Sequence, residues 1–512
     1  MENEFLTRNS PGPRRAGCRE TFVLFEVATD MLAYEELKGS SGRQMYFRPK
    51  RFEAANLFFG TPPKVTINAN AFRLGNISLT GLGASANQSV ELDFGEADVV
   101  PITISQAGVE IFASRARVVR CERHVFGSRI ALNLVDGSVD FNSLLRRNAH
   151  ARISQQLTVL EPDTKSLVTA EYRAHCADVL RFLRAYRAVT DAGMQPQAGR
   201  NSNLSIDDLF ALCEERIIPQ WRKLWLGGNQ LVRGIMQDKP RLDAFKEFTE
   251  LVISPEFNQG PVWWRSYFKP AGYPGDFEIM NYVYDWQREG KDIYSQLLHR
   301  IGLDVSECIA TRMHVVRKTI SNIVAANQSS EPARILSLGC GSAREIQLHL
   351  EDSSTVDLPV LFTLIDQEEN ALAYAYDKSY PLTLTMKKLA RVQALNVSFT
   401  DVLRGGKWLD DVGPQELIYS VGLIDYLVDK RARALTERLY DRLAPGGLLI
   451  IGNMNETDLS NLWPMEFITD WHLFYRNEPE MIAWTSNLEG SRAWTELEPT
   501  GRVRLLFVRK PG

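Results

Sequence analysis

The sequence predicts a multidomain chain with a small β-barrel, a helical connector and an α/β domain built on a parallel sheet. Its length of 512 residues is several times that of a typical domain. The spacing of apolar residues changes along the chain from a period of two to a helical period, and then to alternating strands and helices. The last region opens with RILSLGCGSAREIQLHL (334–350), which predicts a strand, a Gly-x-Gly turn and a helix.

The composition is that of an ordinary globular protein, with 44% hydrophobic and 24% charged residues. A net charge of -4 disfavours nucleic acid as a partner, because such binding relies on neutralising phosphates. We find no apolar run of about eighteen residues and no apolar signal core, so we expect no transmembrane segment and a cytoplasmic location. The six cysteines form no Cys-x-x-Cys pair, so we expect neither a metal site nor a disulfide framework.

The first two regions differ in pattern. Residues 1–40 carry SPGPRR and are expected to be a loosely attached lead-in segment. Residues 41–137 alternate apolar and polar residues, as in KVTINANAFRLGNISLTGLGAS, with Gly and Asn between the runs. Short strands separated by turns at regular spacing predict a small β-barrel.

The remaining two regions are helical and then mixed. Residues 138–330 have the helical period, as in AHCADVLRFLRAYRAVTDAG, and predict a helical connector. Residues 331–512 alternate strands and helices, which predicts a parallel α/β sheet.

Polar residues follow the expected strands of this α/β domain. Gly339 and Gly341 permit a tight turn at which a ligand can approach the backbone. Asp366 ends the second expected strand, where a carboxylate can accept both hydroxyls of a ribose. The third expected strand, in NVSFTDVL (396–403), ends in Asp401, placed to accept from an adenine amino group. The third glycine of a dinucleotide fingerprint is replaced by Arg344, which disfavours a pyrophosphate ligand.

This region resembles the class I methyltransferases that use S-adenosylmethionine. LSLGCGSARE is similar to their first motif, LAPGGLLII to their late strand, and SRAWTELEPTGRVRLLFVRK to their closing antiparallel hairpin. The resemblance implies a Rossmann-like fold and S-adenosylmethionine as cofactor. The residues that it implies for cofactor binding are Gly339, Cys340, Gly341, Asp366, Gln367, Asp401, Val402 and Ser420.

A narrower resemblance lies around this domain. FKPAGYPGDFEIMNYVYD (268–285) and WPMEFITDWHLFYRNEPEM are similar to segments of the extracellular-factor 3-hydroxypalmitic acid methyl ester biosynthesis proteins. The resemblance implies a lipid acceptor, a 3-hydroxy fatty acid methylated on its carboxyl group to give a diffusible signal. We expect the first segment to form a lid over bound cofactor and substrate. The aromatic residues expected to line an acyl tunnel between this lid and the sheet are Trp263, Trp264, Tyr267, Phe268, Tyr273, Phe277, Trp471, Phe474 and Tyr475. The residues expected on the acceptor side are Tyr273, Asp276, Asp425, Tyr426 and Arg476.

The barrel region resembles PilZ domains, which often bind cyclic dimeric GMP. NISLTGLG contains their Asn/Asp-x-Ser-x-x-Gly motif, at Asn76, Ser78 and Gly81. Their arginine motif is replaced by RQMYFRPKR, in which the spacing differs and a glutamine stands in place of an arginine. The residues expected to hold the nucleotide as an effector are Arg43, Arg48, Arg51, Asn76, Ser78 and Gly81.

Three alternatives stay open at this point. The chain is alternatively a non-catalytic cyclic dinucleotide receptor, or an NAD-dependent oxidoreductase, although Arg344 and the Pro-Gly-Gly turn disfavour the latter. A methyltransferase acting on a hydroxyl or an amine is the third, and such an acceptor needs a general base where a carboxylate does not. The oligomeric state is equally open, with a homodimer among the alternatives.

Overall fold

The computed structural model describes residues 50–58, 62–86, 92–124, 127–159, 167–194, 205–352, 358–385, 389–404 and 412–512. The chain divides into two units, residues 1–49 and residues 50–512, and the second contains all of the described residues. The lead-in segment expected at residues 1–40 lies outside the described residues, as do Arg43 and Arg48.

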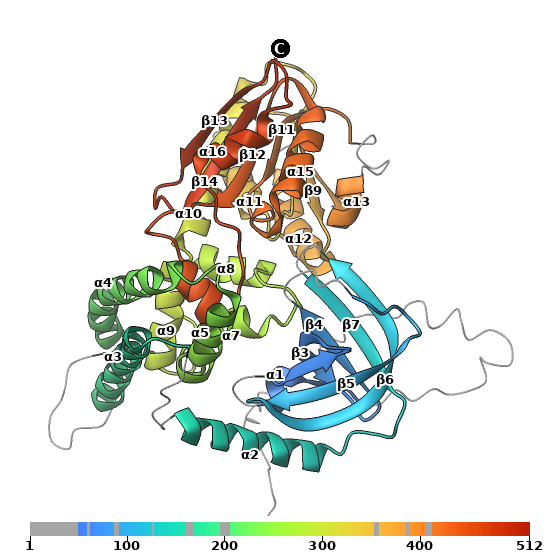
Figure 1. Ribbon diagram of the computed structural model, residues 1–512. Helices are drawn as coiled ribbons and strands as arrows, with labels where there is room; N and C mark the ends of the chain where they lie inside the picture. The colour runs from blue at the N-terminus through green and yellow to red at the C-terminus, as the bar shows by residue number, and fades with distance from the viewer. Residues whose placement is uncertain are drawn as a thin grey trace, which may run out of the picture. The chain divides into compact units, whose positions relative to one another are not determined.

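In the described residues near the start of the chain, six antiparallel strands close into a barrel, as the sequence predicted (Figure 1). The strands are paired in the order β3-β2-β5-β6-β7-β4, and β4 pairs again with β3. In β5 the buried residues Val100, Ile102 and Ile104 alternate with more exposed neighbours. The period of two in the sequence therefore places one face of the strand in the barrel core. The bounds are β1 Phe52–Glu53, α1 Ala54–Leu57, β2 Lys64–Ile67, β3 Asn70–Ile77, β4 Gly81–Ala86, β5 Val99–Gln106, β6 Val109–His124, β7 Gly127–Leu134 and α2 Phe141–Val159.

Helices follow the barrel, again as predicted. Several begin at side chains that accept a backbone N–H of the first turn: Ser205 caps α4, Asp276 caps α8 and Asp292 caps α9. Each of these cap residues has an extended backbone conformation and fixes where its helix starts. The bounds are α3 Ala170–Met194, α4 Ile206–Arg233, α5 Lys239–Val252, α6 Ser254–Phe257, α7 Pro261–Phe268, α8 Phe277–Asp285, α9 Ile293–Val305 and α10 Glu307–Ala326.

The C-terminal region has an α/β fold with a mixed sheet of seven described strands, ordered β10-β9-β8-β11-β12-β14-β13. The first five of these strands are parallel, and β14 runs antiparallel to both β12 and β13, which confirms the predicted closing hairpin. The strands are β8 Ala333–Leu338, β9 Val360–Asp366, β10 Ala390–Asn396, β11 Gln415–Ser420, β12 Leu443–Met454, β13 Arg492–Leu497 and β14 Val503–Arg509. The helical segments are α11 Arg344–Glu351, α12 Glu369–Thr385, α13 Phe399–Arg404, η3 Ile424–Tyr426, α15 Asp429–Asp441, η4 Pro464–Ile468, α16 Glu478–Ile482 and η5 Ala483–Thr485.

One strand boundary was predicted wrongly. The strand expected at 396–403 ends at Asn396, and a helix begins at Phe399. The cause is local, because the Ser398 hydroxyl accepts the Asp401 N–H at 3.1 Å and caps the new helix.

The sheet is covered on both faces (Figure 1). Ile335 and Leu417 belong to the core shared with α10, α11 and α12, whereas Leu336 and Ile418 belong to the core shared with α15. Consecutive residues of each strand therefore enter different cores, which explains why these strands are apolar throughout.

The helical connector and the α/β domain share one core. A segment after β12 carries Trp463, whose indole N–H donates to the Tyr172 hydroxyl of α3 at 2.9 Å. Trp225 of α4 donates to the Ser460 carbonyl at 3.0 Å. A Cβ at Gly228 would lie 2.4 Å from the Trp463 ring, so only glycine leaves room for this indole. The segment after β12 therefore fixes the connector against the sheet.

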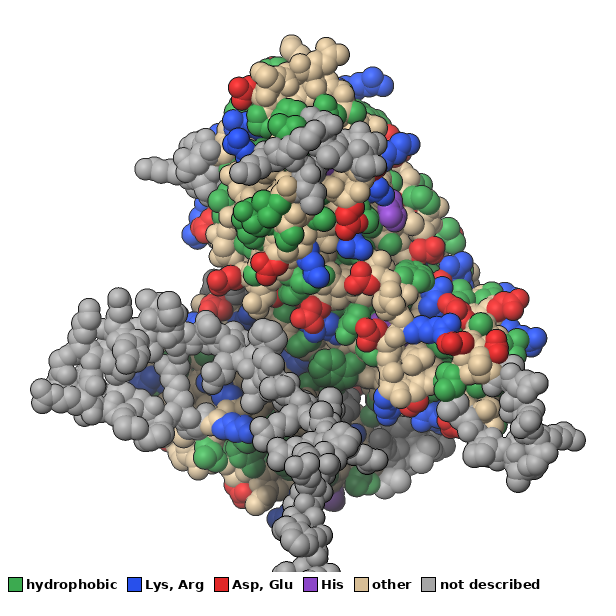
Figure 2. Space-filling view, turned by 180° about the vertical axis from the view of Figure 1, so that it is seen from behind, with side chains coloured by type: hydrophobic (Ala, Val, Ile, Leu, Met, Phe, Trp, Pro, Cys, Tyr) green, Lys and Arg blue, Asp and Glu red, His purple; other side chains and the backbone are tan. Residues whose placement is uncertain are grey.

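None of the helices in the described part of the chain combines the length and the apolar character needed to span a bilayer. Lysine and arginine side chains are interspersed with aspartate and glutamate on the face shown in Figure 2. The described side chains on this face make a surface of mixed charge.

Candidate functional site

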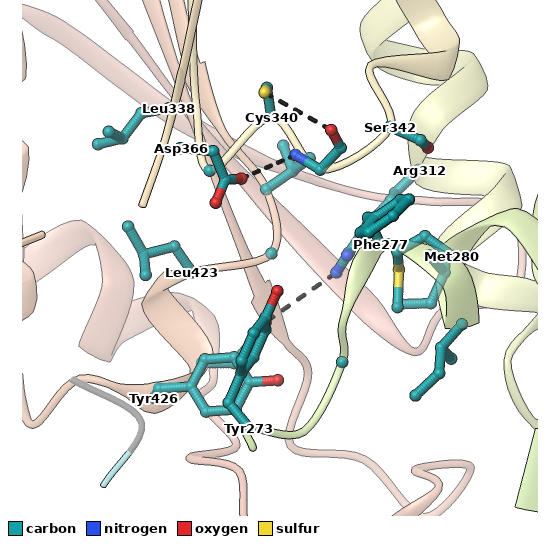
Figure 3. Close-up of a pocket in the computed structure, with 18 of the residues that line it drawn as sticks. Tyr273, Phe277, Met280, Arg312, Leu338, Cys340, Ser342, Asp366, Leu423 and Tyr426 are labelled. Atoms are coloured by element: carbon teal, nitrogen blue, oxygen red, sulfur yellow. Dashed lines mark hydrogen bonds and ion pairs between the residues drawn. The ribbon is translucent and has the colours of Figure 1, made fainter. Parts of the chain in front are cut away.

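A large cavity lies at the carboxyl ends of β8, β9 and β11, where ligands bind in open α/β sheets. The space between its walls, open solvent included, is about 1130 Å³. The residues that line it include Tyr273, Phe277, Met280, Tyr284, Arg312, Gly339, Cys340, Gly341, Ser342, Glu345, Asp366, Gln367, Tyr419, Gly422, Asp425, Tyr426, Met454, Met465 and Trp471. Figure 3 shows Asp366 and Cys340 on one side, Tyr273 and Tyr426 on the other, and Arg312 pointing into the space between them.

The turn after β8 has an unusual backbone. Gly339, Gly341 and Ala343 all have positive φ, of 69°, 51° and 50°. A Cβ would meet no atom closer than 3.6 Å at Gly339 or 4.0 Å at Gly341, so glycine is needed there for its backbone conformation rather than for space. The turn stays open toward the cavity and leaves its backbone accessible to a ligand.

Asp366 holds this turn in place. Its Oδ2 accepts the Gly341 N–H at 3.0 Å, and its Oδ1 accepts the Glu368 N–H at 3.0 Å. The side chain is buried, and burial raises the pKa of its carboxyl, although the backbone N–H groups partly offset this. Each carboxylate oxygen has a second lone pair, so Asp366 can also accept hydroxyl groups from a ligand in the cavity.

Two further acids line the cavity. Glu345 accepts the Tyr419 hydroxyl at 2.7 Å, and burial raises the pKa of both groups. Asp425 accepts the Met454 N–H at 2.5 Å, and its pKa is raised by burial and partly lowered by Arg312. With Asp366 these side chains make three acids against one arginine among the described residues that line the cavity. The excess of acids favours a cationic ligand.

The loop between α7 and α8, residues 269–276, closes one side of the cavity. The Tyr426 hydroxyl donates to the Pro274 carbonyl at 3.3 Å and accepts the Trp471 indole N–H at 2.9 Å. A Cβ at Gly275 would lie 2.6 Å from the Trp471 ring and 2.8 Å from the Tyr426 oxygen. The Tyr273 hydroxyl also contacts the Glu368 carboxylate. The loop is therefore held against both the sheet edge and the segment after β12.

The structure brings most of the sequence-predicted site residues to this cavity and leaves the others outside. Those that line it are Tyr273, Gly339, Cys340, Gly341, Asp366, Gln367, Asp425 and Tyr426. Those that do not are Asp276, Asp401, Val402, Ser420 and Arg476.

The two acceptor-side residues outside the cavity have structural partners. Arg476 donates to Asp429 at 2.8 Å and to Asn453 at 2.7 Å, and also to backbone carbonyls of the loop that follows β11. Its donors are thus occupied, which corrects our expectation that it orients a substrate carboxylate. Asp276 is fully buried, caps α8 and pairs with Arg265 at 2.8 Å.

The cofactor-side residues outside the cavity are also explained by local structure. Asp401 is exposed in the first turn of α13 and accepts the Ser398 hydroxyl at 2.7 Å, which corrects its expected place at the end of a strand. Val402 packs in the core beneath α13. Ser420 ends β11 and is fully buried, and its Oγ has no partner among the described residues.

The expected aromatic tunnel is present only in part. Tyr273, Phe277 and Trp471 line the cavity, but Trp263 and Tyr267 are buried in the packing between helices. The other aromatic residues expected there, Trp264, Phe268, Phe474 and Tyr475, do not line the cavity either. Methionines take part in the lining instead, at Met280, Met454 and Met465. Their flexible thioether side chains adapt to irregular apolar ligands.

Sequence reasoning missed several polar residues of the cavity. Arg312, Glu345 and Ser342 line it and are each at least nine-tenths buried. The Ser342 hydroxyl has no partner among the described residues. One signal was available for Arg312, which lies four residues from Cys308 and four from Val316 on the buried stripe of α10. A charged residue on an apolar helix stripe is a candidate ligand contact.

In the barrel, the turn from Ser78 to Gly81 has the hydrogen bonds of a tight turn. Ser78 N–H donates to the Gly81 carbonyl at 2.8 Å, and the Ser78 hydroxyl accepts the Gly81 N–H at 3.1 Å. A Cβ at Gly81 would lie 2.5 Å from the Leu132 carbonyl oxygen, so strand pairing requires glycine there. Arg51 donates to the Asn76 side-chain oxygen at 2.6 Å, which brings the end of the basic segment to this turn.

No family model matches this chain, and no curated protein is significantly similar to it in sequence. Among solved structures, a possible exported protein from Bordetella parapertussis is 17% identical, over 62% of this chain and 100% of that one, with a TM-score of 0.37. The magnesium protoporphyrin IX methyltransferase of Synechocystis with bound SAH is 14% identical, over 48% and 98%, with a TM-score of 0.33. The N-methyltransferase NodS from Bradyrhizobium japonicum in complex with S-adenosyl-l-homocysteine is 15% identical, over 39% and 87%, with a TM-score of 0.26. These scores are low, so the fold assignment rests on the strand order of the chain itself.

Replacing Glu345 by glutamine should change how stability depends on pH. Burial raises the folded-state pKa of this carboxyl above its usual value of 4.5, so ionisation costs more in the folded chain than in the unfolded one. Stability is therefore highest below pH 4.5 and falls as the pH rises through the folded-state pKa. Glu345→Gln keeps an acceptor for Tyr419 and removes this fall, so its melting temperature relative to the parent should increase from pH 5 to pH 8. A relative melting temperature that decreases over this range would contradict the assignment.

Proposed function

We propose that this protein is an S-adenosylmethionine-dependent methyltransferase. The observation that carries the proposal is the contact between Asp366 and the Gly341 N–H, which sets a buried carboxylate beside an open glycine turn. A ribose needs such an acceptor for its hydroxyls. The acidic lining that Glu345 and Asp425 add to this site suits a ligand that carries a sulfonium and an ammonium group.

The side chains of the cavity fit this cofactor. Asp366 would accept the ribose hydroxyls, and the backbone from Gly339 to Gly341 would pass beside the nucleoside. Ser342 offers a buried hydroxyl that has no partner among the described residues, as a site awaiting a polar ligand requires. When bound, the cofactor supplies a methyl group on a positively charged sulfur.

The chain's own contribution to the transfer is alignment and exclusion of water. The 269–276 loop, held by Tyr426 and Trp471, covers the cavity beside the ends of the strands. Tyr273 and Phe277 add aromatic surface on the same side. These groups restrict the acceptor to the side of the cavity that faces away from Asp366.

For the acceptor, we propose the carboxyl group of a 3-hydroxy fatty acid, as the narrower sequence resemblance implies. Met280, Met454 and Met465 give the cavity an adaptable apolar surface that suits an acyl chain. A carboxylate is already ionised at neutral pH, so its methylation requires no general base. A hydroxyl or amine acceptor would require one, and the pH dependence of the rate separates these alternatives.

Asp366→Asn should weaken S-adenosylmethionine binding about 10- to 100-fold, because the amide replaces charge-assisted hydrogen bonds with neutral ones. Calorimetry with the ligand measures this loss directly. Asp377→Asn, an exposed aspartate on α12, is the matched control and should bind as the parent does.

The same titration addresses the other functional classes. A parent protein that binds NAD and not S-adenosylmethionine would replace this proposal with the oxidoreductase. If the parent protein binds neither ligand, the non-catalytic receptor is the alternative that remains. An unchanged affinity in a well-folded Asp366→Asn variant would remove this residue from the cofactor site.

The rate of carboxyl methylation should be level from about pH 8 to pH 9.5, because the acceptor stays ionised throughout this range. Burial lowers the pKa of Lys269 to about 7. This lysine donates to the Thr469 carbonyl near the cavity wall, so the range starts at pH 8, above the titration of Lys269. Initial rates with 3-hydroxyhexadecanoate and methyl-labelled cofactor give the profile. A rate that rises about tenfold per pH unit would instead indicate an acceptor that must lose a proton.

We further propose that the barrel binds cyclic dimeric GMP as an effector. The supporting observation is the hydrogen bond from Arg51 to Asn76, which joins the basic segment to the turn of Ser78 and Gly81. Guanidinium groups bind phosphates in bidentate fashion, and an asparagine can pair with a guanine edge.

Arg51→Ala and Asn76→Ala should each weaken cyclic dimeric GMP binding by about tenfold or more, because each removes a polar contact to a charged ligand. Calorimetry on the full chain provides the measurement. Lys64→Ala removes an exposed cation from the neighbouring strand β2 and should leave binding unchanged. Absence of binding by the parent at high micromolar nucleotide would exclude the effector role.

A further inference from the structure

Arg312 is an incompletely paired arginine inside the cavity. It lies on α10, is only 5% exposed, and points into the space between Asp366 and Tyr426 (Figure 3). Its Nε has no hydrogen-bond partner among the described residues. Its Nη1 lies 4.0 Å from Asp425 Oδ2, which is too long for a hydrogen bond. A buried guanidinium in this state has donors that remain available to a ligand.

Among the described residues, the two other buried arginines are well paired. Arg502 is 4% exposed and donates to Thr500, to Glu307 and to two backbone carbonyls, the closest being Val305 at 2.8 Å. Arg476, 3% exposed, has partners for Nε, Nη1 and Nη2. Since leaving a buried donor unpaired is costly, the contrast at Arg312 indicates a partner that the protein alone does not supply.

The loop after β11 leaves space for this guanidinium. A Cβ at Gly422 would lie 3.0 Å from Arg312 Nη2, closer than a side chain normally packs. The backbone of Gly422 does not have a positive φ, so its glycine is explained by this approach and not by its conformation. Arg312 is thus packed at the carboxyl end of β11, where it lines the cavity.

We propose that Arg312 receives a carboxylate of a ligand bound in this cavity. The planar fork of guanidinium donors matches a carboxylate in bidentate geometry. This carboxylate can come from the acceptor or from the amino acid end of the cofactor. Both sources rest on the proposed function. Asp425 is an incomplete partner for Arg312, because it lies 4.0 Å away and accepts the Met454 N–H. Either ligand carboxylate would complete the pairing of Arg312.

The experiment compares Arg312→Gln with the parent in two calorimetric arms. The acceptor arm uses 3-hydroxyhexadecanoate and its neutral analogue 3-hydroxyhexadecan-1-ol, without cofactor. The cofactor arm uses S-adenosylmethionine and its decarboxylated analogue. Arg317→Gln, on the same helix but partly exposed and paired with Asp352, is the matched control.

The substitution should weaken binding of one carboxylate ligand roughly 30-fold or more, because a buried charge pair loses one partner. The corresponding ligand without a carboxylate should bind the parent and the variant equally. A selective loss in the acceptor arm assigns the acceptor's carboxylate to Arg312, and a selective loss in the cofactor arm assigns the cofactor's. Equal affinities of parent and variant in both arms, or equal losses with and without the carboxylate, would overturn the proposal.

A second variant protects the test against misfolding of the first. Gly422→Ala leaves Arg312 in the chain but places a methyl group against its Nη2, so it should weaken the same ligand and spare the neutral analogue. If the parent binds no S-adenosylmethionine, the proposed function fails, while the acceptor arm still tests Arg312. If the parent binds it and neither variant discriminates against a carboxylate, only the inference about Arg312 fails.

Discussion

The arrangement of the site depends on the contact between Asp366 and the Gly341 N–H. Parallel pairing of β8 with β9 sets Leu338 opposite Ile365, so both strands end at the same level of the sheet. The turn after β8 then reaches the carboxylate at 3.0 Å, and its positive φ angles become tolerable because glycine occupies two of the three positions. This hydrogen bond keeps a carboxylate at the cavity, and it fixes the turn together with the Gly339 and Cys340 N–H groups, which donate to the Ile365 carbonyl at 2.8 Å and 3.1 Å.

The walls of the cavity come from parts of the chain that are distant in sequence. The segment after β12 inserts Trp463 among the connector helices and returns through Trp471 to the cavity. Trp471 in turn meets Tyr426 and the loop that contains Gly275. Because these contacts belong to one continuous core, this wall of the cavity depends on the packing of the connector on the sheet.

Sequence patterns predicted the barrel, the helices and the parallel sheet, because each follows from the local spacing of apolar residues. The glycine turn and Asp366 were found for the same reason, since they adjoin a strand that is plain in the sequence. Asp401 was misplaced because the Ser398 hydroxyl caps a helix at this point. This local hydrogen bond competes with strand pairing, so the strand ends earlier than expected. Arg476 and Arg312 could not be separated by sequence, because both are arginines in apolar surroundings and only their tertiary contacts differ: one has its donors occupied and the other does not.

In the described residues, two arginines of the barrel contact segments that lead to the cavity, and this limits how an effector could act. Arg73 of β3 donates to the Tyr267 carbonyl at 2.6 Å and to Asp470 at 2.9 Å, while Arg129 of β7 donates to the Ala271 carbonyl. Asp470 directly precedes Trp471, and Ala271 lies two residues before Tyr273, and both Trp471 and Tyr273 line the cavity. A nucleotide on the barrel can change cofactor or acceptor affinity only if it binds more tightly to one arrangement of these contacts than to another. Any such coupling must be reciprocal, so a cavity ligand would change nucleotide affinity by the same factor.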